Sequence, residues 1–216
     1  MKIESYEPYH IGTKLNPYMN FDALKDKLKA ELGRRGYELT KEVGTEPIKI
    51  TPPRELLATK NGTKVELNLS AQALNATGPS PKNVSETFKE LMDILATLGY
   101  EPNAAIVFHE ILANISIKTD EKPLEILNKS TRIKFKLLRN IGNLGLTAMR
   151  ISNAREEDED IVNFIIEPNP TSPTSRFLVT LMFRSKARGK LESFHEQHEK
   201  RVLEVMMQLL GRRGRG

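Results

Sequence analysis

Residues 56–69 read LLATKNGTKVELNL, and this stretch carries the strongest local folding signal in the chain. Asn61-Gly62 favours a two-residue type I′ turn, because both central residues of that turn need a positive φ. After the turn, apolar and polar residues alternate, which is typical of a strand with one buried and one wet face. The stretch therefore predicts a β-hairpin with strands at 56–59 and 65–69.

Two helical patterns flank this hairpin. On its N-terminal side, Asn20 is a candidate N-cap for a helix that we expect to end at Gly33. On its C-terminal side, a regular apolar stripe predicts a helix over 83–98, with Gly99 as its C′ residue. The remaining expectations for this part of the chain are strands at 6–15, 37–40 and 48–50 and a polar loop at 75–82.

The rest of the chain repeats the same order of elements. We expect strands at 104–117, 133–137, 146–151, 161–167 and 176–184, and helices at 123–129 and 190–210. Each half is then a strand, a helix, four strands and a long helix. The predicted fold class is α+β, with two tandem halves that form one curved antiparallel sheet with helices on one face. The predicted domains are 1–100, 101–210 and a flexible Gly-Arg tail at 211–216.

This order of elements resembles the repeat topology of the TATA-binding-protein fold. That resemblance covers most of the chain and implies two halves whose sheets join into one surface. The paired phenylalanines that the family wedges into DNA have no recognisable counterparts here. The resemblance therefore concerns the fold, and it transfers no functional residue.

The composition is that of a folded, basic chain. The 216 residues are 38% hydrophobic and 28% charged, with a net charge of +5. This content suffices to bury a core and excludes a fully disordered chain. Because Cys is absent, disulfides, thiolate nucleophiles and Cys-based zinc sites are excluded. Such a Lys- and Glu-rich chain without Cys is typical of a thermophilic cytosol.

No segment has the character of a membrane anchor or a secretory leader. A membrane helix needs roughly 18 or more apolar residues in a row, and the start MKIESYEPYHIG lacks a basic region followed by an apolar one. We therefore expect a soluble, cytoplasmic protein without a membrane partner.

Few residues are candidates for catalysis or metal binding. His195 and His198 are spaced by three, whereas the zinc-protease pattern needs a spacing of four, so we expect His198 to lie in the apolar stripe of its helix. His109 and Glu110 are strand neighbours and should point to opposite faces. The acidic run 156–160 lacks the ligand spacing of a calcium loop and is expected to be a solvated hairpin loop. The prediction is a non-enzyme with no catalytic residue, metal, cofactor or small-molecule substrate.

Three cations share one face of a predicted strand. Arg132, Lys134 and Lys136 alternate with apolar residues. Alternate positions of a strand are about 7 Å apart, close to the spacing of phosphates along a nucleic acid strand. The alternative interpretation is a solvated sheet edge whose lysines prevent aggregation.

Two further clusters of cations suit a polyanion. The segment before the last helix contains Arg184, Lys186, Arg188 and Lys190. The tail carries Arg212, Arg213 and Arg215 between glycines, and such segments contact phosphates and stack on bases. The alternative for the tail is a frayed terminus. No stacking platform of aromatic residues is visible, so phosphate and shape readout should dominate over base readout.

A basic chain of this size, without Cys and with the tail Arg212-Arg213-Gly214-Arg215, resembles the archaeal ribosome dimerisation factors. That resemblance implies a homodimer, contact with ribosomal RNA or the small ribosomal subunit in dormancy, and no catalysis. The functional expectation is thus an RNA- or ribosome-binding factor that regulates translation. The alternative is a protein–protein interaction or regulatory module with no nucleic-acid role.

Overall fold

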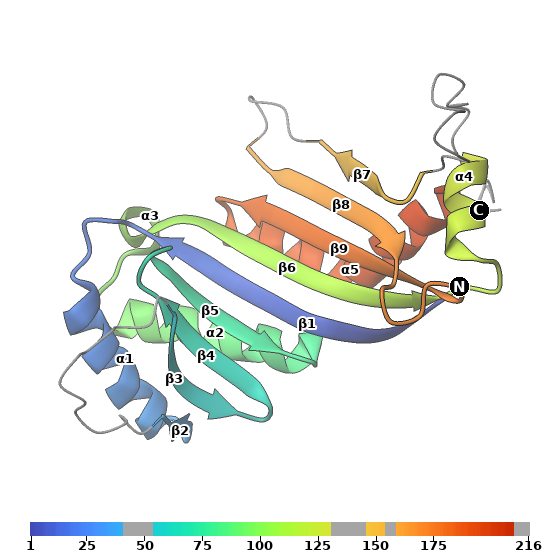
Figure 1. Cartoon of the computed structure of the whole chain (residues 1–216). Helices are drawn as coiled ribbons and strands as arrows, with labels where there is room; N and C mark the ends of the chain where they lie inside the picture. The colour runs from blue at the N-terminus through green and yellow to red at the C-terminus, as the bar shows by residue number, and fades with distance from the viewer. Residues whose placement is uncertain (41–53, 131–145, 154–158, 210–216) are drawn as a thin grey trace. The chain divides into compact units, whose positions relative to one another are not determined.

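A computed structural model of the chain describes residues 1–40, 54–130, 146–153 and 159–209 (Figure 1). They form helices and one nine-stranded antiparallel sheet with the strand order β2-β3-β4-β5-β1-β6-β9-β8-β7. The predicted α+β class is therefore confirmed.

The first part of the chain contains one strand, one helix, four strands and a long helix, and the last of these four strands lies where a loop was predicted. Its elements are β1 (Lys2–Leu15), α1 (Phe21–Arg34), β2 (Glu38–Leu39), β3 (Arg54–Lys60), β4 (Thr63–Asn68), β5 (Ala73–Gly78) and α2 (Pro81–Thr97). The short α3 (Pro102–Ala105) follows and occupies the start of the region predicted as a strand at 104–117.

The second part follows the same order within the described residues. Its elements are β6 (Ile106–Lys118), α4 (Pro123–Ser130), β7 (Met149–Ser152), β8 (Ile161–Pro168), β9 (Arg176–Ser185) and α5 (Arg188–Leu209). The strand predicted at 133–137 and the tail 211–216 lie outside the described residues, as does the strand predicted at 48–50.

The chain divides into two compact units, each built from separated stretches of sequence. Unit 1 comprises Met1–Glu7, Ala113–Phe183 and Glu192–Gly216, and unit 2 comprises Pro8–Leu112 and Arg184–Leu191. Strands β1, β6 and β9 contribute residues to both units. The predicted domain boundaries at 100 and 210 stay predictions.

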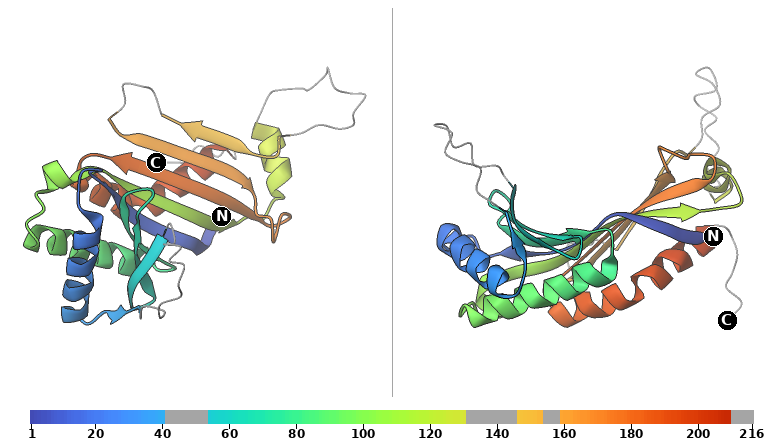
Figure 2. Two further views of the ribbon diagram at one scale, coloured as in Figure 1. Left: turned by 60° about the vertical axis from the view of Figure 1, so that its left-hand side comes forward. Right: turned by 90° about the horizontal axis from the view of Figure 1, so that it is seen from below.

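In unit 2, α2 packs on one face of the strands (Figure 2). Its apolar stripe includes Phe88 and Leu91, which are buried together with Val65 and Leu74 of the sheet. Helix α1 joins this face through Lys29, whose Nζ lies 3.0 Å from Glu55 Oε1 on β3. The other residues of each strand alternate towards a face that no described helix of unit 2 covers, and the polar cluster described below lies there.

In unit 1, α5 provides the buried apolar stripe. Phe194, Val202 and Met206 of α5 are buried, as are alternate residues of β9 from Phe177 onward. The ring of Phe194 stacks on Phe183 with 4.1 Å between centroids. Half-buried and buried residues alternate along all ten residues of β9. The alternation arises because only one face of the strand packs on a helix.

Local turn and cap chemistry explains several boundaries. Asn61 and Gly62 have φ values of 51° and 75°, as the hairpin prediction requires. Asn20 caps α1, because its side chain accepts a hydrogen bond from the Ala23 backbone N–H. The prediction that Gly33 ends this helix was wrong. The helix continues through Arg34, and Gly36, with a φ of 77°, takes the left-handed conformation.

The loop predicted at 75–82 was also wrong, because its first half is strand β5. This strand pairs with β1 on one side and β4 on the other. Its inward residues include Ala76 and Gly78, which give only a weak apolar signal because one has a single methyl group and the other no side chain. Gly78 has to be small, since a Cβ there would lie 3.0 Å from the Gly62 carbonyl oxygen. The second half of the predicted loop contains Ser80, which is the N-cap of α2, and the helix begins at Pro81.

Among the described residues, no helix is both long enough and apolar enough to cross a membrane.

Candidate nucleic-acid interface

The passage from β9 to α5 carries four cations and no acid, and we call it the basic junction. It consists of Arg184, Lys186, Arg188 and Lys190. The backbone turns between the strand and the helix at Ser185, whose Oγ accepts a hydrogen bond from the Ala187 N–H at 3.0 Å. Helix α5 starts at Arg188, so two of these cations stand in its first turn.

Arg184 is held in place from two sides. Its Nε and Nη2 donate to Glu110 Oε2 at 3.0 and 2.5 Å. Its guanidinium carbon lies 4.2 Å from the centroid of the Phe108 ring. Glu110 offsets part of the positive charge, while the two contacts fix the plane of the guanidinium. Arg184 therefore presents an oriented cation rather than a freely moving one.

The other members of the basic junction are more exposed. Lys186 and Lys190 are exposed and Arg188 is half-buried. The positive end of the helix dipole lies at the same end of α5, and the first turn contains no acidic residue. Cations normally avoid this end of a helix, whereas an anion binds favourably there. The charge arrangement at this point is thus suited to a phosphate group.

The other predicted site residues cannot be placed. Arg132, Lys134 and Lys136 lie outside the described residues, and so do Arg212, Arg213 and Arg215. The structure therefore brings together the four residues of the basic junction and leaves the row of three cations and the tail as predictions.

A polar cluster on the uncovered face of unit 2 was missed by sequence reasoning. We call it the Gly12 cluster, and it contains His10, Gly12, Asn75 and Thr77. In the sheet register His10 lies opposite Thr77, and Gly12 lies opposite Asn75. His10 Nδ1 is 2.9 Å from Thr77 Oγ1. Burial, with a smaller effect of the Arg54 charge, lowers the pKa of His10 to about 4, so the ring is neutral at pH 7.

Asn75 is the unusual member of the Gly12 cluster. The residue is only 8% exposed. The amide lies across the neighbouring strand, because a Cβ built on Gly12 would be 2.3 Å from Asn75 Oδ1. The same Cβ would be 3.0 Å from His10 Nε2. Two polar groups thus converge over a glycine that leaves room for them.

The signal that could have revealed this cluster is the alternation within β5. Leu74, Ala76 and Gly78 are buried on one side, while Asn75 and Thr77 face the other. The pattern has the correct period, but the small residues on its inner side resemble a loop.

A second polar cluster lies in unit 1, and we call it the Tyr6 cluster. The Tyr6 hydroxyl lies 2.9 Å from His198 Nε2 and donates to Glu199 Oε1 at 2.7 Å. His198 Nδ1 contacts the His195 carbonyl oxygen. Burial lowers the pKa of His198 below its usual value. His198 is buried in the stripe of α5 as predicted, and the described residues contain no cluster of three or more potential His, Cys, Asp or Glu metal ligands.

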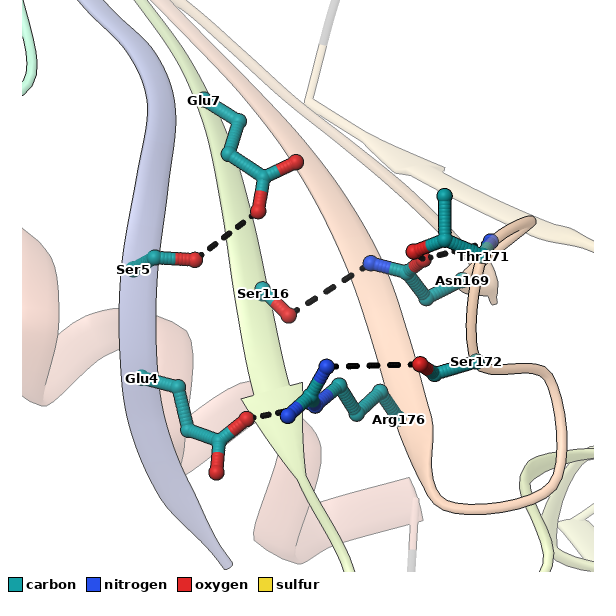
Figure 3. A network of polar contacts seen from close by, with 8 residues as sticks. All are labelled: Glu4, Ser5, Glu7, Ser116, Asn169, Thr171, Ser172 and Arg176. Carbon is teal, nitrogen blue, oxygen red and sulfur yellow. Dashed lines mark hydrogen bonds and ion pairs between the residues drawn. The ribbon is translucent and has the colours of Figure 1, made fainter.

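A third network fixes the loop between β8 and β9 (Figure 3). The buried side chain of Asn169 accepts hydrogen bonds from the backbone N–H and the hydroxyl of Thr171. Arg176 Nε lies 2.5 Å from Glu4 Oε2, and Arg176 Nη1 donates to Ser172 Oγ. Each cation and amide in this network has a partner within the chain. We therefore interpret it as structural.

Comparisons with known proteins find a similarity to a solved structure but none to a family model or a curated protein. No family model matches the sequence, and no curated protein matches it. Among solved structures, Methanococcus jannaschii TBP has a similar arrangement, with a TM-score of 0.41 and 12% identity over 97% of each chain.

Proposed function

We propose that this protein is a non-enzymatic RNA-binding factor that contacts the RNA backbone through the basic junction. The observation that carries the proposal is the presence of four cations, without an acid, where β9 passes into the first turn of α5. Phosphate groups would interact favourably with these cations and would also accept hydrogen bonds from the N-terminal turn of the helix.

The oriented guanidinium of Arg184 adds geometric preference to this charge. A planar guanidinium with a fixed orientation binds phosphate oxygens in a defined direction, whereas lysines bind them as point charges. Lys186 and Lys190, which are exposed, would then contribute affinity by releasing counterions from the RNA. Deletion of 211–216 should weaken binding further if the tail extends this surface.

Fluorescence anisotropy with a labelled structured RNA at several salt concentrations tests the proposal. The double variant Lys186→Ala/Lys190→Ala should weaken binding and reduce the slope of log Kd against log salt by about 1–2. The matched control is Lys82→Ala/Lys89→Ala, which removes the same charge from exposed positions of α2. Equal losses in both variants would mean that net charge alone governs binding, and the basic junction would lose its role.

A narrower form of the proposal is that the RNA is ribosomal and that two copies of the chain join two small subunits. It is supported by the basic, Cys-free composition and the Gly-Arg tail. Sedimentation of the protein with small subunits through a low-salt gradient, together with a peak of paired subunits, is the expected result. A chain that binds RNA but stays at the top of that gradient would contradict the narrower form alone.

The alternative function is a protein–protein interaction module. The pairing of Arg184 with Glu110 favours it, because this ion pair lowers the charge that the basic junction can offer to a phosphate. Absence of RNA binding at low salt would support this alternative.

A further inference from the structure

Tyr18 is an almost fully exposed aromatic residue on a hydrogen-bonded turn between β1 and α1. We propose that its ring stacks on one unpaired base of the RNA whose backbone lies on the basic junction. The inference rests on the proposed RNA-binding function and adds to it a contact with a base. Because every base has a flat face, this contact would increase the affinity without selecting a sequence.

The first step is the exposure of the ring. Tyr18 is 96% exposed, and it is the one aromatic residue among the exposed large hydrophobic residues of the described part of the chain. The other aromatic residues described by the structure are buried or half-buried. Nearly all of the Tyr18 ring surface is therefore available to a ligand.

The second step is the backbone of the turn that carries this ring. Asn16 Oδ1 accepts a hydrogen bond from the Tyr18 N–H at 3.0 Å, and the Asn16 carbonyl oxygen accepts one from the Met19 N–H at 3.1 Å. The Asn16 backbone N–H and side-chain amide donate to the carbonyl oxygens of Ala105 and Ala104 in α3, at 2.8 and 3.0 Å. The turn is thus ordered before a ligand arrives, so little backbone entropy is lost on binding.

The third step is the position of the turn within unit 2. Strand β1 ends beside α3, and α3 leads directly into β6 (Figure 1). Phe108, whose ring lies against the Arg184 guanidinium, follows Ala105 by three residues, which is about 10 Å along an extended strand. Tyr18 and Arg184 both belong to unit 2. A short single strand of RNA can therefore place its phosphates at the basic junction and one base at the turn.

The fourth step is the charge at this end of unit 2. Asp22 stands in the first turn of α1, and Glu101 directly precedes α3, to which the Tyr18 turn is hydrogen-bonded. Both acids are exposed. They disfavour a phosphate group at the turn, whereas a neutral base is not repelled. The charges therefore favour backbone contact at the basic junction and base contact at Tyr18.

The surroundings of Tyr18 favour a base over a protein partner. A protein interface has a core of several apolar side chains, which surround each anchor residue and exclude water from it. None of the other residues from 16 to 22 is a large exposed hydrophobic residue. Stacking on a single base needs only one aromatic face and no pocket.

The lack of tryptophan in the chain allows stacking to be observed directly. The sequence contains no Trp, so Tyr18→Trp introduces a single indole at the turn. Its fluorescence should be quenched as a short oligoadenylate is added at low salt, in parallel with the binding curve from anisotropy. A sugar-phosphate strand of the same length without bases should leave the fluorescence unchanged, because it offers nothing that can stack. Equal quenching by both strands would overturn the inference.

Two substitutions measure what the ring contributes to affinity. Tyr18→Ala should weaken the binding of oligoadenylate about tenfold, as expected for the loss of one base–aromatic stack. The dependence of log Kd on log salt should keep its slope, because no charge is removed. Tyr18→Phe keeps the ring and should bind as the wild type does. Tyr18→Ala should also unfold at the wild-type temperature, and a lowered melting temperature would indicate a structural role for the ring and overturn the inference.

The matched control for the fluorescence experiment is Leu39→Trp. Leu39 is 44% exposed on β2, and three strands separate β2 from β1 in the sheet. Its indole should not be quenched by oligoadenylate, and quenching equal to that of Tyr18→Trp would contradict a specific contact. Addition of Lys186→Ala/Lys190→Ala to Tyr18→Trp should shift quenching to higher RNA concentrations. An unchanged midpoint would mean that the turn and the basic junction do not bind the same RNA.

The outcomes distinguish this inference from the proposed function. If anisotropy shows RNA binding while Tyr18→Ala binds as tightly as the wild type, stacking is refuted and binding through the basic junction stands. The exposed ring would then be assigned to a protein partner. If no RNA binds at low salt, the proposed function fails and the base contact fails with it.

Discussion

The Gly12 cluster and the Tyr6 cluster contain similar residues but differ in how these residues are hydrogen-bonded. Both place a partly buried histidine, with a lowered pKa, beside a hydroxyl group. In the Tyr6 cluster the hydroxyl contacts both His198 and Glu199, and both histidine nitrogens have partners. In the Gly12 cluster His10 contacts Thr77 through one ring nitrogen, while Asn75 Oδ1 and His10 Nε2 converge over Gly12.

The difference separates a cluster with several hydrogen bonds from one whose polar groups are held mainly by packing over a glycine. A complete network of buried hydrogen bonds contributes to folding stability, and removal of one member leaves the others unsatisfied. Substitutions in the two clusters should therefore differ in the size of their effect on stability.

The largest effect is expected for His198→Ala in the Tyr6 cluster. His198 is 5% exposed within the apolar stripe of α5, so the substitution leaves a cavity and deprives Tyr6 of a partner. The free energy of unfolding should fall by about 3 kcal/mol. Urea denaturation measures this value, and a loss below about 1 kcal/mol would mean that the cluster is not a stabilising one.

The next effect is a dependence of stability on pH that originates at His10. Its pKa is about 4 in the folded chain against 6.5 as its ordinary value. As the pH falls below 6.5, the unfolded chain takes up a proton that the folded chain does not, so stability is lost between pH 6.5 and 4. The loss between pH 7 and 5 should be about 1–2 kcal/mol, allowing for screening by solvent.

The control for this pH effect is His10→Gln, which keeps a hydrogen-bonding group opposite Thr77. Denaturation curves of both chains at pH 7 and pH 5 give the difference, in which the carboxylates that titrate in the same range cancel. If the two chains lose stability equally, burial does not lower the pKa of His10 as described.

A smaller effect is expected for Tyr6→Phe. This change keeps the ring and removes only the hydroxyl, so no cavity forms while His198 and Glu199 each lose one hydrogen bond. The cost should be about 1 kcal/mol. In the double variant with His198→Ala the two costs should not add, because both remove the same contact.

The smallest effect is expected for Asn75→Ala, which should change the free energy of unfolding by less than about 0.5 kcal/mol. The change removes little packing, because the side chain is short and its β-carbon is kept. A destabilisation comparable to that of His198→Ala would make the two clusters alike and would remove the basis of the comparison.

Most of the fold could be predicted from local chemistry. The hairpin at Asn61-Gly62, the cap at Asn20 and the Gly99 C′ residue each depend on backbone conformations that few residue types favour. The buried stripe of α2 and the alternation along β9 follow from contact with a single layer. These features are properties of neighbouring residues, so a sequence displays them directly.

The candidate sites were predicted less well, for a physical reason. The basic junction is a run of nearby cations and was recognised, but the position of Glu110 beside Arg184 depends on the pairing of strands 74 residues apart. The Gly12 cluster joins β1 to β5 across a similar distance, and the small residues of β5 concealed it as a loop. Residues that are far apart in the sequence and meet over a glycine produce no pattern among neighbouring residues that could reveal the site.

The place of β1 in the strand order has a consequence for synthesis. Residues Pro8–Leu15 are made before both of their neighbours in the sheet, β5 and β6, which the ribosome completes only at residues 78 and 118. At about 5–20 residues per second, the strand waits on the order of 5–20 s for its second neighbour. During that delay, chaperones or other nascent chains can reach the side chains of Tyr9, Ile11 and Leu15. Each of these residues is at most 1% exposed once the protein has folded.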